Sequence, residues 1–283
     1  MAIKLIASDL DGTLIDHNNL IPSKNLDAIN SIHNKHINFA ICTGKTYSIT
    51  KDICEKCNAS YGIFGNGTQI INLKTGEEIY KNVLPVESFN ICYKIAKKFN
   101  LHIHIYTDSE VITEKLMYMD LRNYKINGSK DTQTLSFKIV DNIKNYINTN
   151  KPQIFKLVIS SEDSLENIKN NILEKLDVGI QHIRKKGQYK DKIINKEYEY
   201  LDITQKNIGK GYALNYLSNF LQVDSNDIMA IGDNVNDIDM LKASGIGVTL
   251  ANAYDEIKQI ATYTTTNTVE NSGFAEAVYK FIT

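Results

Sequence analysis

The sequence of 283 residues has no tryptophan, only 3 prolines and 4 cysteines, and no long hydrophobic run. A helix that spans a membrane needs about 20 apolar residues in succession, and no stretch approaches that length. Near the N-terminus, Asp9 and Asp11 fall where a signal peptide would continue its apolar core. These absences predict a protein of the cytoplasm that has no membrane partner.

An excess of charge of one sign is also lacking. Lys and Arg number 32 against 33 for Asp and Glu, which gives a net charge of -1. This balance provides no basic surplus to hold a nucleic acid backbone, so nucleic acid is not an expected partner. Hydrophobic residues make up 42% of the chain and charged residues 23%, as in ordinary globular proteins. At roughly 150 residues per domain, the length admits one large domain or two of medium size.

The few residues with metal or redox chemistry do not form complete motifs. Cys54 and Cys57 have the spacing of a redox or half-zinc motif, but neither a second such pair nor a nearby histidine pair completes it. We therefore expect two reduced thiols at these positions. His102 and His104 share one face of a predicted strand, and a core or surface pair is favoured there over a zinc site because further ligands are missing.

Both ends of the chain alternate short apolar strands with helices. In the N-terminal part the pattern predicts strands at 3–8, 37–42 and 61–64 and helices from Ser23 and at 46–57. From Asn207 onward it predicts strands at 228–231 and 246–249 and helices at 209–221, 238–243, 254–260 and 273–281. Such alternation is typical of an α/β fold, in which helices cover a parallel sheet on both faces.

The middle of the chain follows a different pattern. It predicts helices at 86–99, 116–124 and 162–176, a polar stretch at 127–134, and strands at 101–106, 110–114, 154–160, 179–184 and 197–203. The strands at 101–106 and 110–114 are close enough to pair antiparallel, and the basic run 185–192 is predicted to be a solvated hairpin tip. We therefore expect a core domain of residues 1–82 and 203–283, interrupted by an α+β domain of residues 83–202 with one open sheet face.

Polar residues follow several of the predicted core strands. Asp9 and Asp11 follow the first strand, Thr43 follows the second, and Asp233 and Asp237 follow a late one. In an open parallel sheet, ligands bind outside the carboxyl ends of the strands, where these side chains are expected to meet.

The residue types at this edge favour Mg²⁺ and phosphate. Carboxylates gathered at one place repel one another unless a cation is present, and a ligand set made only of oxygen favours Mg²⁺ over zinc. Lys210 begins a helix and adds its charge to the positive helix end, while Thr43 offers a hydroxyl and Gly44 an accessible amide. Singly, each feature has a plainer interpretation: a turn or calcium-loop fragment, a surface lysine, a strand end. Their joint arrangement favours phosphate chemistry.

Four motifs of the sequence resemble the motif set of the haloacid dehalogenase (HAD) superfamily, in the same order along the chain. The motifs are Asp9-Leu-Asp11-Gly-Thr13, Thr43-Gly44, Gly209-Lys210-Gly211 and Gly232-Asp233-Asn-Val-Asn236-Asp237. The long insert between the second and third motifs resembles the C2 type B cap of the Cof-like phosphatases. Outside the insert, Asn66-Gly67 and Ala251-Asn252-Ala253 stand where that family usually has a similar Asn-Gly-Ala and Gly-Asn-Ala. The resemblance implies a Rossmann-like core with an inserted cap that acts as a lid and reads the substrate.

The resemblance also implies a role for each motif residue. Asp9 would be the nucleophile that forms an aspartyl-phosphate, and Asp11 would protonate the leaving alcohol and then activate water. Mg²⁺ would be held by Asp9, the backbone carbonyl of Asp11 and Asp233, with Asp237 binding it directly or supporting these ligands. The phosphoryl oxygens would be bound by the amide of Leu10 and by Thr43, Gly44, Lys210 and Asn236. The implied activity is a Mg²⁺-dependent phosphatase of a small phosphorylated metabolite, such as a sugar phosphate or a cofactor-like phosphate.

The sequence departs from the family pattern at two positions and leaves two other activities open. Lys45 stands where these phosphatases more often have Arg, and Cys42 where a small apolar residue is usual. An ammonium lacks the bidentate fork of a guanidinium, so substrate preference is what these departures affect. A phosphomutase similar to the phosphomannomutases is one alternative, and a catalytically silent binding protein is the other, although all four carboxylates are retained. Neither the substrate nor the oligomeric state follows from the sequence.

Overall fold

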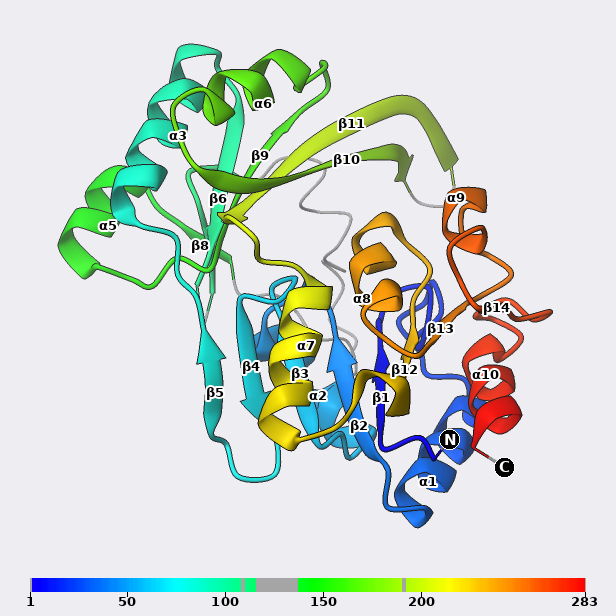
Figure 1. Ribbon diagram of the computed structural model, residues 1–283. Coiled ribbons are helices and arrows are strands. Elements are labelled where there is room, and N and C mark those ends of the chain that lie inside the picture. The colour runs from blue at the N-terminus through cyan, green and yellow to red at the C-terminus, as the bar shows by residue number, and fades with distance from the viewer. Residues whose placement is uncertain (1, 108–109, 116–136, 190–191, 283) are drawn as a thin grey trace. The chain divides into compact units, whose positions relative to one another are not determined.

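The computed structural model describes residues 2–107, 110–115, 137–189 and 192–282, and these form two compact units. The first unit contains Met1–Lys81 and Ile208–Thr283, and the second contains Asn82–Asn207. Both ends of the chain therefore build one unit, and the middle builds the other (Figure 1). None of the helices in the described ranges is long and apolar enough to cross a membrane.

The first unit, called the core unit below, contains one sheet of eight strands in the order β14-β13-β12-β1-β2-β3-β4-β5. Its strands are β1 (Leu5–Ser8), β2 (Asn38–Cys42), β3 (Tyr61–Phe64), β4 (Gln69–Asn72), β5 (Glu78–Lys81), β12 (Ile228–Ile231), β13 (Ile246–Thr249) and β14 (Tyr263–Thr264). Six strands run parallel, with Ser8 opposite both Ile231 and Ile41. The α/β fold with a parallel core sheet is confirmed.

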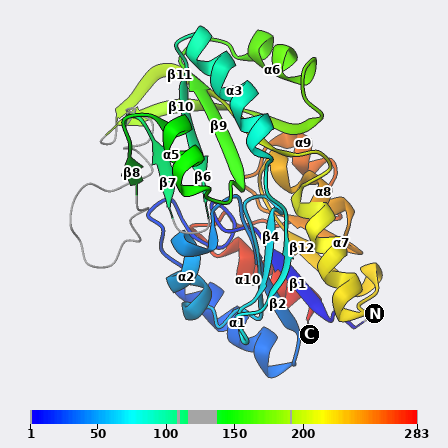
Figure 2. The ribbon, with the colours of Figure 1, turned by 90° about the vertical axis from the view of Figure 1, so that its left-hand side faces the viewer.

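The core sheet is covered by helices on both faces, because alternate residues of its strands point to opposite sides. Ile6 and Phe39 pack against helices α1 (Ser23–Asn34), α2 (Tyr47–Lys56) and α10 (Gly273–Phe281). Leu5 and Ala40 pack against α7 (Lys210–Leu221), α8 (Ile238–Lys242) and α9 (Asp255–Lys258) on the other face. Figure 2 shows α2 and α7 on opposite sides of the strands.

The edge of the core sheet beyond β3 is antiparallel, which the sequence pattern did not predict. After β3 the chain reverses at Gly65, Asn66 and Gly67, whose φ angles of 60°, 58° and 101° lie in the left-handed region. Glycine and asparagine adopt such angles at low cost, so this tripeptide forms a hairpin turn. β4 and β5 then pair antiparallel and end the sheet.

The second unit, called the inserted unit below, contains a mixed sheet in the order β10-β11-β9-β6-β7-β8. Its strands are β6 (His102–Tyr106), β7 (Val111–Thr113), β8 (Phe137–Ile139), β9 (Lys156–Ser161), β10 (Val178–Tyr189) and β11 (Lys192–Gln205). All neighbours pair antiparallel except β7 and β8. Helices α3 (Val86–Lys98), α5 (Ile143–Asn150) and α6 (Glu166–Leu173) supply its apolar core together with the inward side chains of the strands.

Three sequence predictions for the inserted unit need correction. β10 and β11 extend to Tyr189 and from Lys192, so most of the predicted basic turn at 185–192 is strand, because antiparallel pairing continues through it. α6 begins at Glu166 and ends at Leu173, inside the predicted helix 162–176. β8 was not predicted because it has only three residues, and α5 was not predicted because most of its residues are polar. The predicted helix at 116–124 and the polar stretch at 127–134 lie outside the described residues.

Candidate active site

Two neighbouring strand ends bring the first and last acidic motifs together. β1 and β12 lie side by side and parallel, and the backbone N–H of Asp9 donates to the carbonyl of Ile231 at 2.8 Å. Asp9 therefore leaves β1 where the chain turns from β12 toward Asp233. Between Asp9 and Thr13 the chain bends at Gly12, whose φ is 83° and whose added Cβ would lie 2.6 Å from Asp233 Oδ2. Only glycine allows this close approach of the two motifs.

A fully buried lysine joins two of the carboxylates. Lys210 Nζ donates at 2.6 Å to Oδ1 of Asp9 and at 2.6 Å to Oδ1 of Asp237, and the lysine side chain has no exposed surface. Asp239 fixes the start of α7, because its Oδ2 accepts the N–H of Gly211 at 2.9 Å. The lysine is thus held at the sheet edge by the beginning of its own helix.

Asp237 uses both of its oxygens within the protein. Oδ1 accepts from Lys210, and Oδ2 accepts the backbone N–H groups of Asp233 at 3.1 Å and Asn234 at 3.0 Å. The carboxylate is completely buried. It therefore fixes both the lysine and the loop that carries Asp233.

Asp233 is oriented by two residues whose contacts the sequence did not indicate. Thr13 Oγ1 donates to its Oδ1 at 2.7 Å, and Asn252 Nδ2 lies 3.4 Å from its Oδ2. Asn252 also donates to the carbonyl of Gly12 at 2.9 Å, so it connects the two acidic loops. Both residues belong to motifs quoted above, but their partners are remote in sequence.

Burial and like charge perturb the titration of the cluster. Burial raises the pKa of Asp233 to about 7, against the hydrogen bond from Thr13 that lowers it. Burial also raises the pKa of Asp9 well above its usual range; Lys210 opposes this shift and Asp237 adds to it. For Lys210, burial would lower the pKa, but the charges of Asp237 and Asp9 outweigh it and hold the pKa well above its ordinary value. An additional positive charge would thus be stabilised at this cluster.

The three carboxylates are close enough to share a cation. One oxygen from each of Asp9, Asp233 and Asp237 lies within 4.8 Å of the other two. The donors are all oxygens, which suits a hard divalent ion. Asp11 is not part of this cluster: its half-exposed carboxylate binds Lys45 Nζ at 2.6 Å.

The predicted phosphate-binding residues of the second motif are joined to the last motif through Asn66. Asn236 Nδ2 donates to Asn66 Oδ1 at 3.1 Å, and an added Cβ on Gly44 would come within 2.9 Å of the same oxygen. Thr43 is buried, and its Oγ1 accepts the N–H of Lys45 at 3.2 Å. The side chain of Leu10 is buried in the core, so only its backbone is available to a ligand.

Comparison with known proteins identifies the family. A profile of the haloacid dehalogenase-like hydrolases matches residues 6–278, nearly the whole chain. The chain belongs to the haloacid dehalogenase-like hydrolase family. The resemblance of its four motifs is thereby confirmed, and the protein is an enzyme of the hydrolase class.

Relatives of this hydrolase include named phosphatases. The 5-amino-6-(5-phospho-D-ribitylamino)uracil phosphatase YcsE of Bacillus subtilis is 28% identical over 281 residues, which cover 99% of this chain and 96% of the relative. The HMP-PP phosphatase of Yersinia pestis strain Pestoides F is 25% identical over 257 residues, or 90% and 86% of the two chains. A solved haloacid dehalogenase-like hydrolase from B. subtilis has the same fold, with a TM-score of 0.80 and 21% identity over 98% and 99% of the chains.

The remaining sequence candidates of the hydrolase do not form sites. Cys54 and Cys57 are buried free thiols, and burial raises the pKa of each to about 12, which opposes redox reactivity. Cys42 is also buried, and burial raises its pKa well above its usual range.

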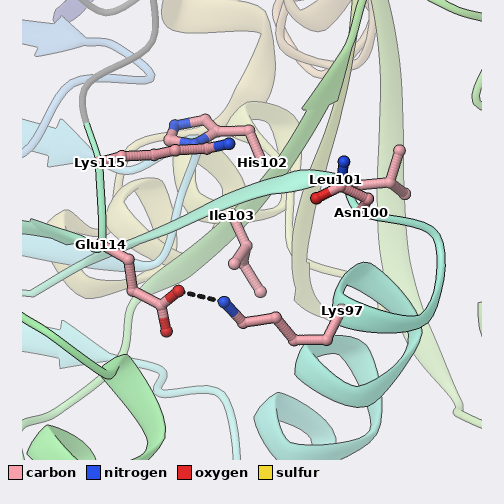
Figure 3. A pocket seen from close by; sticks show the side chains of 7 residues that line it. All are labelled: Lys97, Asn100, Leu101, His102, Ile103, Glu114 and Lys115. Atoms are coloured by element: carbon pink, nitrogen blue, oxygen red, sulfur yellow. Dashed lines mark hydrogen bonds and ion pairs between the residues drawn. The ribbon is translucent and has the colours of Figure 1, made fainter.

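The histidine pair lies in the inserted unit. His102 and His104 are both on β6 with ring centroids 5.4 Å apart, so they share one face of the strand as predicted. Within the described residues, neither belongs to a group that could hold a metal ion. His102 does line a small pocket, whose other lining residues are Lys97, Asn100, Leu101, Ile103, Glu114 and Lys115. Figure 3 shows Lys97 paired with Glu114 across it.

The Glu114 carboxylate at this pocket is bonded through both of its oxygens. Its Oε1 accepts the Tyr93 hydroxyl at 2.7 Å and the N–H of Ile143 at 3.1 Å, while its other oxygen binds Lys97. The carboxylate thus joins α3 and the start of α5 to the end of β7. Its charge is already matched inside the inserted unit.

Proposed function

We propose that this hydrolase is a Mg²⁺-dependent phosphatase that cleaves a small phosphorylated metabolite through an aspartyl-phosphate on Asp9. The observation that carries the proposal is the cluster of Asp9, Asp233 and Asp237 at the carboxyl ends of β1 and β12, in which the buried Lys210 pairs with Asp9 and Asp237. Three acidic groups and one lysine at this edge of the sheet provide both a nucleophile and a place for a phosphoryl group.

The cluster fits a divalent cation. Asp9 and Asp233 would bind it directly, together with the backbone carbonyl of Asp11. Asp237 has both oxygens committed to Lys210 and to two backbone amides, so its role would be to support those ligands. When bound, Mg²⁺ would supply positive charge beside the phosphoryl oxygens.

Asp9 and Asp11 divide the two chemical steps between them. The Asp9 carboxylate attacks phosphorus, its O–P bond forms, and the ester P–O bond breaks while Asp11 donates a proton to the leaving alcohol oxygen. Water then attacks the aspartyl-phosphate, Asp11 takes the proton of that water, and the Asp9 O–P bond breaks to release phosphate. Lys210 Nζ donates to Oδ1 of Asp9 at 2.6 Å and so orients the nucleophile.

The phosphoryl oxygens are placed by groups around the nucleophile. We assign this role to the amide of Leu10 and to Thr43, Gly44, Lys210 and Asn236. Asn236 donates to Asn66, and the same Asn66 side chain lies close to Gly44. Asn66 therefore fixes the spacing between Asn236 and Gly44. Fixed donors stabilise developing negative charge without having to reorganise.

The inserted unit is proposed to select the leaving group. The catalytic residues assigned above all belong to the core unit, so the inserted unit is free to vary with the substrate. A sugar phosphate or a cofactor-like phosphate is the expected substrate class, and two relatives act on 5-amino-6-(5-phospho-D-ribitylamino)uracil and HMP-PP, by their names.

A phosphate-release assay with a panel of phosphorylated metabolites tests the proposal. The native protein with Mg²⁺ should release phosphate from at least one sugar or cofactor phosphate, and Asp9→Asn should reduce turnover by about 10⁴-fold or more because an amide cannot form the acyl phosphate. Acid quenching during turnover should leave a phosphate-sized mass increase on the peptide that contains Asp9.

Asp255→Asn is the matched control, because the Asp255 side chain is 94% exposed and lies in α9. It should retain native turnover. Near-native phosphate release by Asp9→Asn would reject the mechanism. Conversion of a hexose 1-phosphate into an isomer without phosphate release would identify a phosphomutase, and complete inactivity on the panel would favour a binding protein.

A further inference from the structure

Lys210 lies at the very beginning of α7, so the position of its ammonium depends on how that helix begins. Gly209 is the N-cap residue of α7, and Lys210 is the first helical residue. Helical side chains lean toward the amino end of their helix, so the lysine side chain extends past the beginning of α7 to Asp9 and Asp237. A shift of the first turn would carry the ammonium with it.

The residue that begins α7 cannot hold the first turn itself. The first N–H groups of a helix have no partner within it, and a side-chain oxygen of the N-cap residue usually accepts one of them. Gly209 has no side chain to do so. The acceptor comes from another helix, because Asp239 of α8 accepts the N–H of Gly211 at 2.9 Å. Asp239 thus caps α7 across the contact between the two helices (Figure 1).

The two glycines that flank Lys210 provide the space for this contact. A Cβ added to Gly209 would overlap Oδ2 of Asp239, and a Cβ added to Gly211 would overlap the backbone oxygen of Asp239. Neither glycine has a positive φ, so close approach rather than backbone conformation explains them. The Gly-Lys-Gly motif therefore lets α8 approach the first turn of α7.

One short segment holds Lys210 at both ends. Asp237 accepts from the lysine ammonium at 2.6 Å, and Asp239, two residues later, holds the backbone next to the lysine. Asp239 Oδ1 also accepts the N–H of Met240 at 2.9 Å, which fixes the carboxylate at the beginning of α8. Residues 237–239 thus determine both where the lysine begins and where its ammonium lies.

We infer that Asp239 is a positioning residue for Lys210. The inference rests on the proposed function, which gives Lys210 its role beside the nucleophile and the phosphoryl oxygens. Asp239 binds backbone amides, and it acts by keeping the first turn of α7 where the ammonium reaches Asp9. A charge stabilises a transition state best when its position is fixed in advance.

Steady-state phosphate release tests this role. Asp239→Leu removes the acceptor of the Gly211 N–H, and it should lower kcat about tenfold with a smaller change in KM, because a misplaced ammonium stabilises the transition state less. The Asp239 side chain is exposed, so the substitution leaves the apolar core intact. Asp239→Asn retains an acceptor oxygen and should recover most of the lost turnover.

Asp224→Leu is the matched control. Asp224 is also exposed, and its side chain accepts one backbone N–H, that of Asn226, at 2.9 Å. It precedes β12, so it lies at the end of that strand opposite to the catalytic cluster. The control loses the same kind of hydrogen bond and should retain native kcat.

A double variant shows whether Asp239 acts through the lysine. In the Lys210→Met chain no ammonium is left to position, so adding Asp239→Leu should lower kcat by less than about twofold. An equal loss with and without Lys210 would overturn the inference, since Asp239 would then affect turnover independently of the lysine. Native kcat in Asp239→Leu, or no recovery in Asp239→Asn, would overturn it as well.

Crystal structures of the native chain and the Asp239 variants test the same point without turnover. In Asp239→Leu, Lys210 Nζ should lie beyond hydrogen-bond distance of Asp9, whereas Asp239→Asn should keep the native contact. An unchanged contact in Asp239→Leu would overturn the inference. If the native chain released no phosphate from any substrate, the proposed function would fail, and these structures alone would decide whether Asp239 positions the lysine.

Discussion

In the described part of the chain, each unit buries one lysine against aspartate, and the two lysines lie in different kinds of place. Lys210 in the core unit begins a helix at the carboxyl ends of parallel strands and meets Asp9 and Asp237, both at 2.6 Å. Lys156 in the inserted unit begins β9 and meets Asp202 of β11 at 2.7 Å on the face of a sheet. In a parallel sheet, polar residues that follow the strands meet at one edge of the sheet. In an antiparallel pair such as β9 and β11, polar side chains meet on a face of the sheet instead.

The two lysines also differ in how far their charge is matched, which fits a catalytic role for the core cluster, as proposed, and a structural role for the pair in the inserted unit. Lys156 balances one carboxylate, and its Nζ lies 4.5 Å from the centroid of the Tyr106 ring, so its charge is matched within the sheet. Lys210 stands among more acidic groups than it can neutralise, and burial raises the pKa of Asp233 to about 7. The remaining negative charge of the core site calls for a cation, and the pair in the inserted unit does not.

Removal of the proposed metal should lower turnover more than the replacement of either buried lysine, and it should act on the core site alone. Excess EDTA should lower phosphate release by about 10³-fold or more, because the ion contributes several kcal/mol to a charged transition state. Added Mg²⁺ should restore the activity. It should also raise the melting temperature, since a ligand that binds the folded state stabilises it. Undiminished turnover in excess chelator would contradict the metal role.

Replacing each buried lysine tests the comparison directly. Lys210→Met should reduce turnover by roughly 10²- to 10³-fold, because Asp9 loses its only ammonium partner among the described residues and the phosphoryl oxygens lose a charge. Lys156→Met should change the turnover of a small substrate by less than about tenfold. Lys210→Met removes the ammonium partner of Asp9 and Asp237, and Lys156→Met removes that of Asp202. Loss of one partner of a buried ion pair costs about 3–5 kcal/mol of stability. Hydrogen exchange should show the loss of stability in the core unit for Lys210→Met and in the inserted unit for Lys156→Met. An equal loss of turnover in the two variants would contradict the assignment of one lysine to catalysis and the other to structure.

The parallel strands of the core sheet could be predicted from the sequence, and its antiparallel edge could not. The strands at 61–64, 228–231 and 246–249 match their predicted bounds, because each is a buried apolar run between turn residues. β4 and β5 are equally short but were missed, because their place in the sheet depends on a hairpin turn rather than on an apolar pattern. Pairing across strands, not local sequence, sets such edges.

In the candidate site, the residues at strand ends were predictable from the sequence, whereas the side-chain contacts between remote residues were not. Asp9 and Asp233 are polar residues directly after buried strands, and parallel pairing of β1 with β12 is enough to bring them together. The contacts of Thr13 and Asn252 with Asp233 join residues 220 and 19 positions apart, and they depend on side-chain directions that no sequence pattern carries. The ion pair of Asp11 with Lys45 belongs to this second kind.

Replacement of Lys45 should lower turnover less than replacement of Lys210. The ion pair of Lys45 with Asp11 is partly exposed, since the two side chains are 31% and 50% exposed. Lys45→Ala should change stability by less than about 1 kcal/mol, since exposed pairs contribute little. Turnover should fall about tenfold as Asp11 loses the partner that positions it. Lys45→Arg, which preserves the charge, should recover most of it. A loss as large as that of Lys210→Met would place Lys45 among the groups that bind the phosphoryl oxygens.

Two carboxylates outside the proposed chemistry should affect stability in acid and leave turnover unchanged. Burial would raise the pKa of Glu276 in the core unit, but hydrogen bonds from two backbone amides at 266–267 and from the Tyr263 hydroxyl lower it from the ordinary 4.5 to about 2. In the inserted unit, burial likewise opposes a lowered pKa of Glu114, which Lys97 and Tyr93 maintain.

A carboxylate whose pKa is lower in the folded than in the unfolded chain stabilises the fold above the unfolded pKa, and this contribution disappears as the pH falls through the folded pKa. For Glu276 the window therefore runs from about pH 4.5 down to about 2. Melting temperatures of Glu276→Gln should vary less with pH across this window than those of the native chain. Glu256→Gln, on the exposed side of α9, should follow the native curve. A native melting temperature that is constant from pH 5 to pH 2.5 would show that these hydrogen bonds do not favour the charged form of Glu276.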